Sequence, residues 1–192
     1  MNSGISMIET MRDFIERIGG LGIEYMVTGS YAMSAFGEIR MTRDIDVVVR
    51  LTEKNVGPFL NRFKDDHYIS DESIRRALSR RSMFNIVSHE HGGKIDCIIP
   101  KGTTFDRTSF ARRYKETVAG IGFWTITRED LVVSKLNWAK DTHSEMQIRD
   151  IANLTDAEYD SAYVGGWIDR LDLREIWAEV ERWKTQHVKQ DK

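Results

Sequence analysis

The sequence has little cysteine and little proline: one Cys97 and two prolines, Pro58 and Pro100, in 192 residues. A single cysteine cannot form an internal disulfide or build a multi-cysteine zinc site, and this usage is typical of proteins in reducing compartments. No apolar run approaches the roughly 20 residues of a membrane span. The first residues lack the basic and apolar stretches of a signal peptide. We therefore expect a cytoplasmic protein with no membrane segment.

The sequence also lacks an excess of one charge. It contains 28 Lys and Arg against 30 Asp and Glu, which gives a formal net charge of -2. The chain as a whole is therefore not an electrostatic nucleic-acid binder, although this leaves room for a local basic patch. A hydrophobic fraction of 41% and a charged fraction of 30% are ordinary for a globular protein.

The order of patterns predicts a mixed α/β core followed by helices. Residues 7–18 have helical apolar spacing, whereas residues 23–27, 45–49, 83–88 and 94–99 are short, apolar strand candidates. Residues 114–124 form a weaker strand region. Thr52 and Thr127 are candidate helix N-caps. We expect an α/β (α+β) core over residues 1–125, with a mixed, mostly antiparallel sheet flanked by helices, and a helical C-terminal region over residues 126–192 that packs on the core.

The most informative feature is a set of acids on strands. Asp44 and Asp46 open the β-branched run at residues 45–49, and strand alternation points both side chains to one face. Asp96 lies in a second apolar strand, where it would join them if the two strands pair. At about 5 Å and an effective dielectric near 20, each pair of these charges repels by roughly 3 kcal/mol. Oxygen ligands in such a site suggest Mg²⁺ or Mn²⁺ as the cofactor.

A glycine and a serine precede these acids. Gly29 lets the backbone approach a ligand closely, and the N–H groups at the start of a following helix over residues 30–36 favour phosphate. The Ser30 hydroxyl can add one donor. A phosphate cradle beside a metal-binding carboxylate cluster suits in-line phosphoryl or nucleotidyl transfer.

These residues carry a family resemblance. Gly29-Ser30, thirteen intervening residues, Asp44-Ile45-Asp46 and the later strand acid Asp96 resemble the signature of the DNA polymerase β-like nucleotidyltransferase superfamily. The segment 40–46 resembles its minimal nucleotidyltransferases, including the abortive-infection toxins. Residues 134–140 and 149–151 resemble the lysine and Arg-Asp helical motifs of that group. The resemblance covers roughly residues 20 to 155.

The resemblance implies a fold, a reaction and roles. It implies a nucleotidyltransferase that moves a nucleoside monophosphate from a nucleoside triphosphate to a hydroxyl of a protein, an RNA or a small molecule. Asp44 and Asp46 would bind metal and triphosphate, and Asp96 would help bind metal and activate the acceptor hydroxyl. The expected catalytic and metal-binding residues are Asp44, Asp46 and Asp96, and the expected nucleotide-binding residues are Gly29, Ser30, Arg40, Thr42, Lys135 and Asp150.

Other interpretations of the same residues stay open. Two acids at a strand end can be solvated termini, Lys135 can be a solvated helix lysine, and Asp150 can form a surface ion pair with Arg149. Arg40 and Thr42 can orient Asp44 or shape its loop.

For the whole protein, the competing hypothesis is a catalytically degenerate regulator with this fold. It would bind nucleotide or a partner protein, as one half of a toxin–antitoxin pair. Separately, a helix over residues 71–81 carries four arginines, Arg75, Arg76, Arg80 and Arg81. They spread around its circumference, which is typical of a solvated helix and less so of a nucleic-acid footprint.

Overall fold

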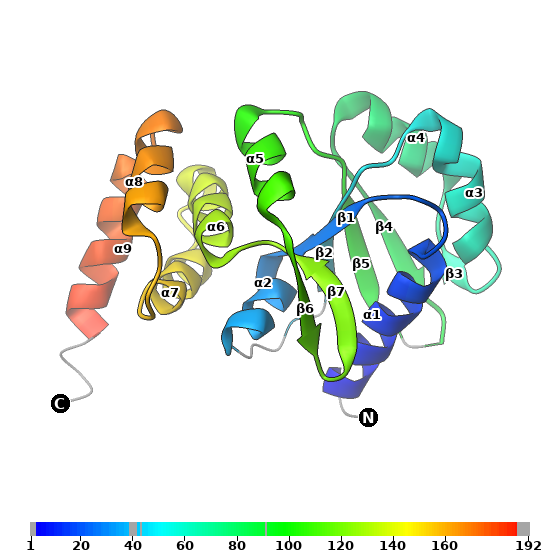
Figure 1. Ribbon diagram of the computed structural model, residues 1–192, viewed down its shortest axis with the longest axis horizontal. Helices are drawn as coiled ribbons and strands as arrows, with labels where there is room; N and C mark the ends of the chain where they lie inside the picture. Colours follow the sequence, from blue (N-terminus) through cyan, green and yellow to red (C-terminus); the bar gives the residue numbers. More distant parts are fainter. Residues whose placement is uncertain (1–2, 39–41, 43, 91, 188–192) are drawn as a thin grey trace. The chain divides into compact units, whose positions relative to one another are not determined.

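The computed structural model describes residues 3–38, 42, 44–90 and 92–187. The chain divides into two compact units, Met1–Ile126 and Thr127–Lys192 (Figure 1). Arg40, one of the predicted nucleotide-binding residues, lies outside the described residues.

The first unit is built on a single sheet. Within the described residues its strands are β1 (Tyr25–Thr28), β2 (Asp44–Val49), β3 (His67–Tyr68), β4 (Met83–Ser88), β5 (Lys94–Ile98), β6 (Tyr114–Val118) and β7 (Ile121–Thr125). They lie in the order β3-β4-β5-β2-β1-β7-β6. The pairs β2/β5 and β1/β7 are parallel and the other neighbours are antiparallel, so the predicted mixed, mostly antiparallel sheet is confirmed.

Helices join these strands. They are α1 (Ser3–Ile18), α2 (Gly29–Ala32), the 3₁₀ helix η1 (Met33–Phe36), α3 (Glu53–Phe63), α4 (Asp71–Arg80) and α5 (Thr104–Arg112). Thr52 caps α3 as predicted, in a capping box with Asn55. The expected helix over residues 30–36 is instead two short pieces, α2 and η1, which end at Gly37 in the left-handed conformation.

Strand alternation gives the sheet two different faces. Ile45 and Val47 on β2 and Ile95 and Cys97 on β5 are fully or almost fully buried and share one face. Burial raises the pKa of the Cys97 thiol far above its ordinary value, so this cysteine is a core residue and not a nucleophile. The residues between them in sequence point to the other face, which carries the acids.

Phenylalanines attach helices to the buried face. The Phe59 ring on α3 lies 5.0 Å from the Phe63 ring and 5.9 Å, edge-on, from the Phe84 ring of β4, measured between centroids. Phe63 in turn lies 6.0 Å from Phe14 of α1. All four rings are almost inaccessible to solvent. The helices α1 and α3 therefore cover the sheet face opposite to the acids (Figure 1).

The second unit is helical within its described residues. Its helices are α6 (Arg128–Thr142), α7 (Glu145–Leu154), α8 (Ser161–Arg170) and α9 (Arg174–His187). Thr127 caps α6 as predicted, and its hydroxyl accepts a hydrogen bond from the Asp130 backbone N–H. The helices bury Leu136, Ile151 and Val180 between them. Among the described residues of both units, no helix is long and apolar enough to cross a membrane.

We predict that Phe59→Ala lowers the free energy of unfolding by about 3–5 kcal/mol, because it removes a fully buried ring and leaves a cavity between α3 and β4. Urea unfolding monitored by circular dichroism measures this loss. Asn61→Ala, on the exposed side of α3, is the matched control and should change stability by less than about 0.5 kcal/mol. Equal effects in the two variants would show that Phe59 does not anchor α3.

Candidate functional site

A row of polar side chains crosses the sheet face opposite to α1 and α3. Asn85 on β4 is the register partner of Asp96 on β5, and Asp96 is the partner of Asp46 on β2. Asp46 is in turn the partner of Thr28, the last residue of β1. Neighbouring strands lie about 4.8 Å apart, so the Asp46 and Asp96 carboxylates emerge side by side. The sheet thus brings together the two acids that the sequence placed on separate strands.

Lys94 links the remaining acid to this row. Its Nζ lies 3.1 Å from Asp44 Oδ2 and 3.0 Å from Asp96 Oδ2. Burial alone would lower the pKa of Lys94, but the hydrogen bonds and charges of Asp96 and Asp44 outweigh it and raise the pKa above its ordinary value. The ammonium group therefore stays charged and serves as a counter-ion between the two carboxylates.

Asp96 is the most enclosed of the acids. Its side chain is 9% exposed, against 40% for Asp44. The Asn85 amide donates a hydrogen bond to Asp96 Oδ1, while Lys94 contacts Oδ2. A buried carboxylate needs such partners, and here they fix the orientation of both oxygens.

Gly29 lies directly against Asp46. Its φ is +64°, a conformation that glycine adopts at little cost. A Cβ placed on Gly29 would overlap the Asp46 carboxylate and lie within 2.7 Å of its Cγ. Gly29 is therefore required by the close approach of the β1–α2 turn to the acid. From the sequence alone, Gly29 is expected to make room only for phosphate.

The other expected residues of the first unit lie close by. Ser30 is the second residue of α2. The Thr42 hydroxyl donates a hydrogen bond of 2.9 Å to the backbone oxygen of Asp44 and lies 3.4 Å from the Asp44 backbone nitrogen. Both contacts are to the backbone of Asp44 and not to its carboxylate, so both interpretations of Thr42 stay open. Binding of nucleotide by Gly29, Ser30 and Thr42 stays a prediction.

Lys135 and Asp150 come together in the second unit. Lys135 Nζ on α6 lies 2.9 Å from Asp150 Oδ2 and 3.1 Å from Gln147 Oε1 on α7. Both charged side chains are almost completely buried. Lys135 is therefore not a solvated helix lysine, and Asp150 is not part of a surface pair with Arg149. Breaking such a buried pair by removing one partner is costly. Their predicted role toward nucleotide stays a prediction.

The donor chemistry of the first unit suits a hard divalent cation. Asp44, Asp46 and Asp96 offer only carboxylate oxygens, which Mg²⁺ and Mn²⁺ prefer. The Lys94 ammonium group already places a positive charge between Asp44 and Asp96. Across the part of the chain that the structure describes, however, no three His, Cys, Asp or Glu side chains converge as closely as metal ligands do.

Sequence reasoning missed two members of this site, Asn85 and Lys94. Both could have been found from the β4–β5 hairpin, in which the Ser88 N–H donates to the Gly93 oxygen. In an antiparallel hairpin the turn fixes the register, and three residues before Ser88 and three residues after Gly93 this register pairs Asn85 with Asp96. Lys94 precedes Asp96 by two residues and shares its face.

A solved structure shares this architecture. A crystal structure of ANT(2")-Ia in complex with adenylyl-2"-tobramycin matches with a TM-score of 0.60 over 88% of this chain and 99% of that chain, at 10% sequence identity. The chain has a nucleotidyltransferase fold. A nucleotidyltransferase-like protein from Paracoccidioides brasiliensis matches at 12% identity over 91% of this chain and 90% of that chain. Its TM-score is 0.48. No protein-family model and no curated protein matches the sequence.

We predict that Gly29→Ala lowers the free energy of unfolding by more than a Gly→Ala change at another left-handed glycine does. The reason is that the new methyl group must displace the Asp46 carboxylate. Gly20→Ala is the matched control, since Gly20 has a φ of +77° and open space around its Cβ position. The control should lose about 1 kcal/mol from backbone strain alone. Gly29→Ala should lose at least about 1 kcal/mol more in urea unfolding. Equal losses would show that the contact with Asp46 is not limiting.

Proposed function

We propose that the protein is a metal-dependent nucleotidyltransferase, which transfers a nucleoside monophosphate from a nucleoside triphosphate to an acceptor hydroxyl. The observation that carries the proposal is the pairing of Asp46 with Asp96 across β2 and β5, next to Gly29 and bridged to Asp44 through Lys94. Such a concentration of carboxylates on one sheet face costs stability, and costs of this kind are expected at functional sites. The nucleotidyltransferase fold adds support of a general kind.

In the proposed reaction all three acids bind metal, and Asp96 has a second task as the base. When bound by Asp44, Asp46 and Asp96, Mg²⁺ or Mn²⁺ would neutralise the triphosphate and the developing negative charge. The acceptor oxygen attacks the α-phosphorus, the bond to the bridging oxygen of the β-phosphate breaks, and diphosphate leaves. Asp96 takes the proton of the acceptor hydroxyl at Oδ2, the atom that Lys94 contacts. Asn85 keeps the opposite oxygen oriented throughout.

Lys94 has a role of its own in this proposal. In the absence of substrate and metal, its ammonium group neutralises part of the negative charge of Asp44 and Asp96. It must leave Asp96 Oδ2 before that oxygen can accept a proton. A lysine side chain has enough rotatable bonds to move aside at modest cost.

The acceptor is a hydroxyl of a protein, an RNA or a small molecule. The structural neighbour ANT(2")-Ia was crystallised with adenylyl-2"-tobramycin. A small-molecule hydroxyl, with tobramycin as one compound to try, therefore belongs among the acceptors tested.

We predict that Asp44→Asn and Asp96→Asn fail in different ways. Asp44→Asn should lose metal-dependent triphosphate binding together with transfer, because an amide oxygen is a poor ligand for a hard cation. Asp96→Asn should keep most of the affinity and lose about 10²–10⁴ in transfer rate, the usual contribution of a positioned base. Calorimetric titration with each triphosphate and Mg²⁺ measures the first effect, and single-turnover labelling with α-labelled triphosphate measures the second.

The labelling assay offers a cell extract, purified RNA and tobramycin in separate arms. Asp65→Asn, an exposed acid outside the row, is the matched control and should behave as the wild type. Tight triphosphate binding without labelling in any arm would overturn transfer in favour of a nucleotide-binding regulator. Wild-type transfer by Asp96→Asn would remove Asp96 from the mechanism.

We predict that Lys94→Met tightens Mn²⁺ binding by about five- to tenfold, because it removes a cation that competes for Asp44 and Asp96. The same change should lower thermal stability without metal, since the carboxylates lose their counter-ion. Mn²⁺ binding by electron paramagnetic resonance gives a readout that does not need activity. Lys54→Met, an exposed lysine on α3, is the control. Unchanged or weaker Mn²⁺ binding in Lys94→Met would show that the cation binds elsewhere.

A further inference from the structure

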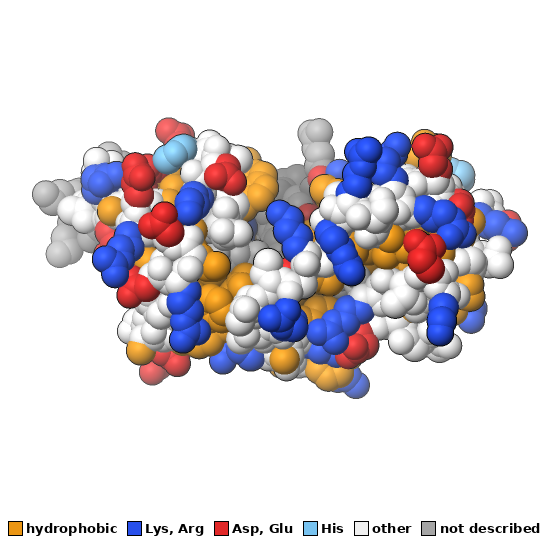
Figure 2. Space-filling view, turned by 90° about the horizontal axis from the view of Figure 1, so that it is seen from above, with side chains coloured by type: hydrophobic (Ala, Val, Ile, Leu, Met, Phe, Trp, Pro, Cys, Tyr) orange, Lys and Arg blue, Asp and Glu red, His pale blue; other side chains and the backbone are white. Residues whose placement is uncertain are grey.

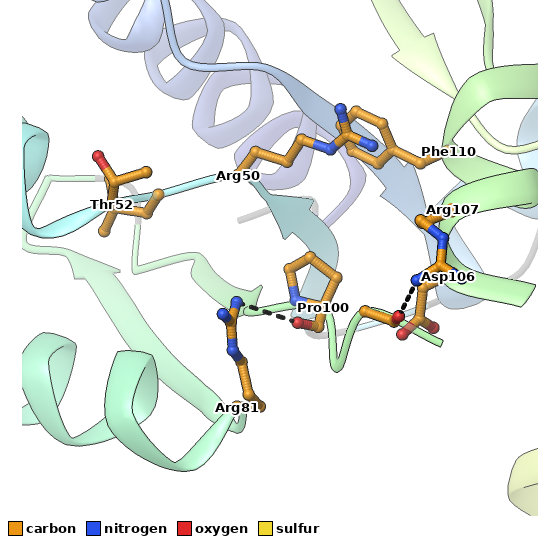
Figure 3. Close-up of a pocket in the computed structure, with 9 residues that line it drawn as sticks. Arg50, Thr52, Arg81, Pro100, Asp106, Arg107 and Phe110 are labelled. Carbon is orange, nitrogen blue, oxygen red and sulfur yellow. Dashed lines mark hydrogen bonds between the residues drawn. The ribbon is translucent and has the colours of Figure 1, made fainter. Parts of the chain in front are cut away.

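A cavity lies at the other end of the strands that carry the acids. It has a volume of about 250 Å³, and Arg50, Pro100 and Phe110 are among the residues that line it (Figure 3). Arg50 follows the last residue of β2, whereas Asp46 lies near its start. At about 3.3 Å per residue these two positions are roughly 13 Å apart along the strand. The cavity is therefore separate from the carboxylate row.

Three arginines surround this cavity: Arg50, Arg81 and Arg107. Figure 3 shows them on different segments around the cavity, Arg50 after β2, Arg81 after α4 and Arg107 on α5. Arg81 donates a hydrogen bond to the Pro100 oxygen and Arg107 donates one to the Gly102 oxygen, so backbone carbonyls of one loop hold both. A guanidinium group has five N–H donors, more than these contacts use.

Arg50 is held in place from two sides. Its guanidinium carbon lies 4.1 Å from the centroid of the Phe110 ring, and its Nη1 lies 3.1 Å from Glu24 Oε2. Arg113 also lies 4.1 Å from the Phe110 centroid and contacts the other oxygen of Glu24 at 2.6 Å. This packing orders the arginine before any ligand arrives, which reduces the entropy lost on binding.

Arg81 stands apart from the other arginines of α4. Arg75 and Arg76 are committed to Asp71 and Glu72 of the same helix. Arg81 instead ends the helix with a φ of +50°, a left-handed conformation that costs a residue with a side chain about 1 kcal/mol or more. The basic cluster in the sequence thus contributes one arginine to the cavity.

The charge around the cavity is positive. Asp106 is the acid among its lining residues, against three arginines. One oxygen of Asp106 accepts a hydrogen bond of 3.0 Å from the Thr103 backbone N–H in the capping box of α5. In the view of Figure 2, Lys and Arg side chains are more prominent than acidic ones over the first unit.

We propose that this cavity is a binding site for the phosphate groups of a small molecule. Guanidinium groups match phosphate oxygens in geometry and charge, and arginine is preferred wherever such paired hydrogen bonds matter. The volume lies below the roughly 300–1,000 Å³ of pockets for drug-sized ligands, which suits a compact anion. The arginines surround one cavity and do not form a stripe, which argues against a nucleic-acid track. This site does not depend on the proposed transferase activity.

Inorganic diphosphate is the probe for this site, titrated calorimetrically into the full chain in 150 mM salt with EDTA present. EDTA removes metal-dependent binding at the carboxylate row. We expect the wild type to bind diphosphate, and Arg81→Ala and Arg107→Ala each to weaken binding by about tenfold or more, because each loses charge-assisted hydrogen bonds. Both side chains are exposed, so both variants should fold, as circular dichroism will check.

Two variants serve as matched controls. Arg76→Ala removes the same charge from α4, away from the cavity, and Asp46→Asn alters the carboxylate row; both should bind diphosphate as the wild type does. No diphosphate binding by the wild type would overturn the proposal. So would an equal loss in Arg76→Ala and Arg81→Ala, which would indicate general charge attraction. Binding of an oligoribonucleotide through Arg81 and Arg107, without binding of diphosphate, would replace a small-molecule site by an RNA contact.

Discussion

The first unit is organised around a repulsion between two carboxylates, since β2 and β5 pair in a register that sets Asp46 beside Asp96. Like charges directly opposite each other weaken a sheet. The neighbouring residues offset this cost: Lys94 supplies a positive charge, Asn85 donates a hydrogen bond, and Gly29 leaves room for the Asp46 side chain. The opposite face of the same strands, packed against the phenylalanines of α1 and α3, holds the register in place.

Much of this arrangement could be predicted from the sequence because it follows from period and capping. The β-branched run after Asp44 fixed which residues face the core, and the threonine caps fixed the starts of α3 and α6. The predictions failed where the determinant is not periodic. The two-residue β3 is too short to give a pattern. The position of Lys94 Nζ depends on the rotamer of a long side chain that has two acids, Asp44 and Asp96, within reach. The burial of Asp150 depends on how α6 and α7 pack, which local sequence does not specify.

The strand β2 serves two ends of the first unit with different chemistry. Its start carries acids on the exposed face, and the residue after its end carries an arginine beside Phe110. One rigid element thus separates a carboxylate site from a cavity lined by guanidinium groups. Because a strand transmits position more faithfully than a loop, the two sites keep a fixed spacing. In the absence of a metal cation the acids repel anionic ligands. The arginine-lined cavity at the other end of β2 attracts them.

The alternation along β5 has a consequence for how this protein can change during evolution. Lys94 and Asp96 lie on the face that carries the acids, while Ile95 and Cys97 face the phenylalanines. A one-residue insertion within β5 would exchange the two faces on one side of the insertion. It would bring a charged group into the core or an isoleucine over the carboxylates. Length variation in descendants of this chain should therefore gather in surface turns such as 119–120, where φ is already positive, and spare β5.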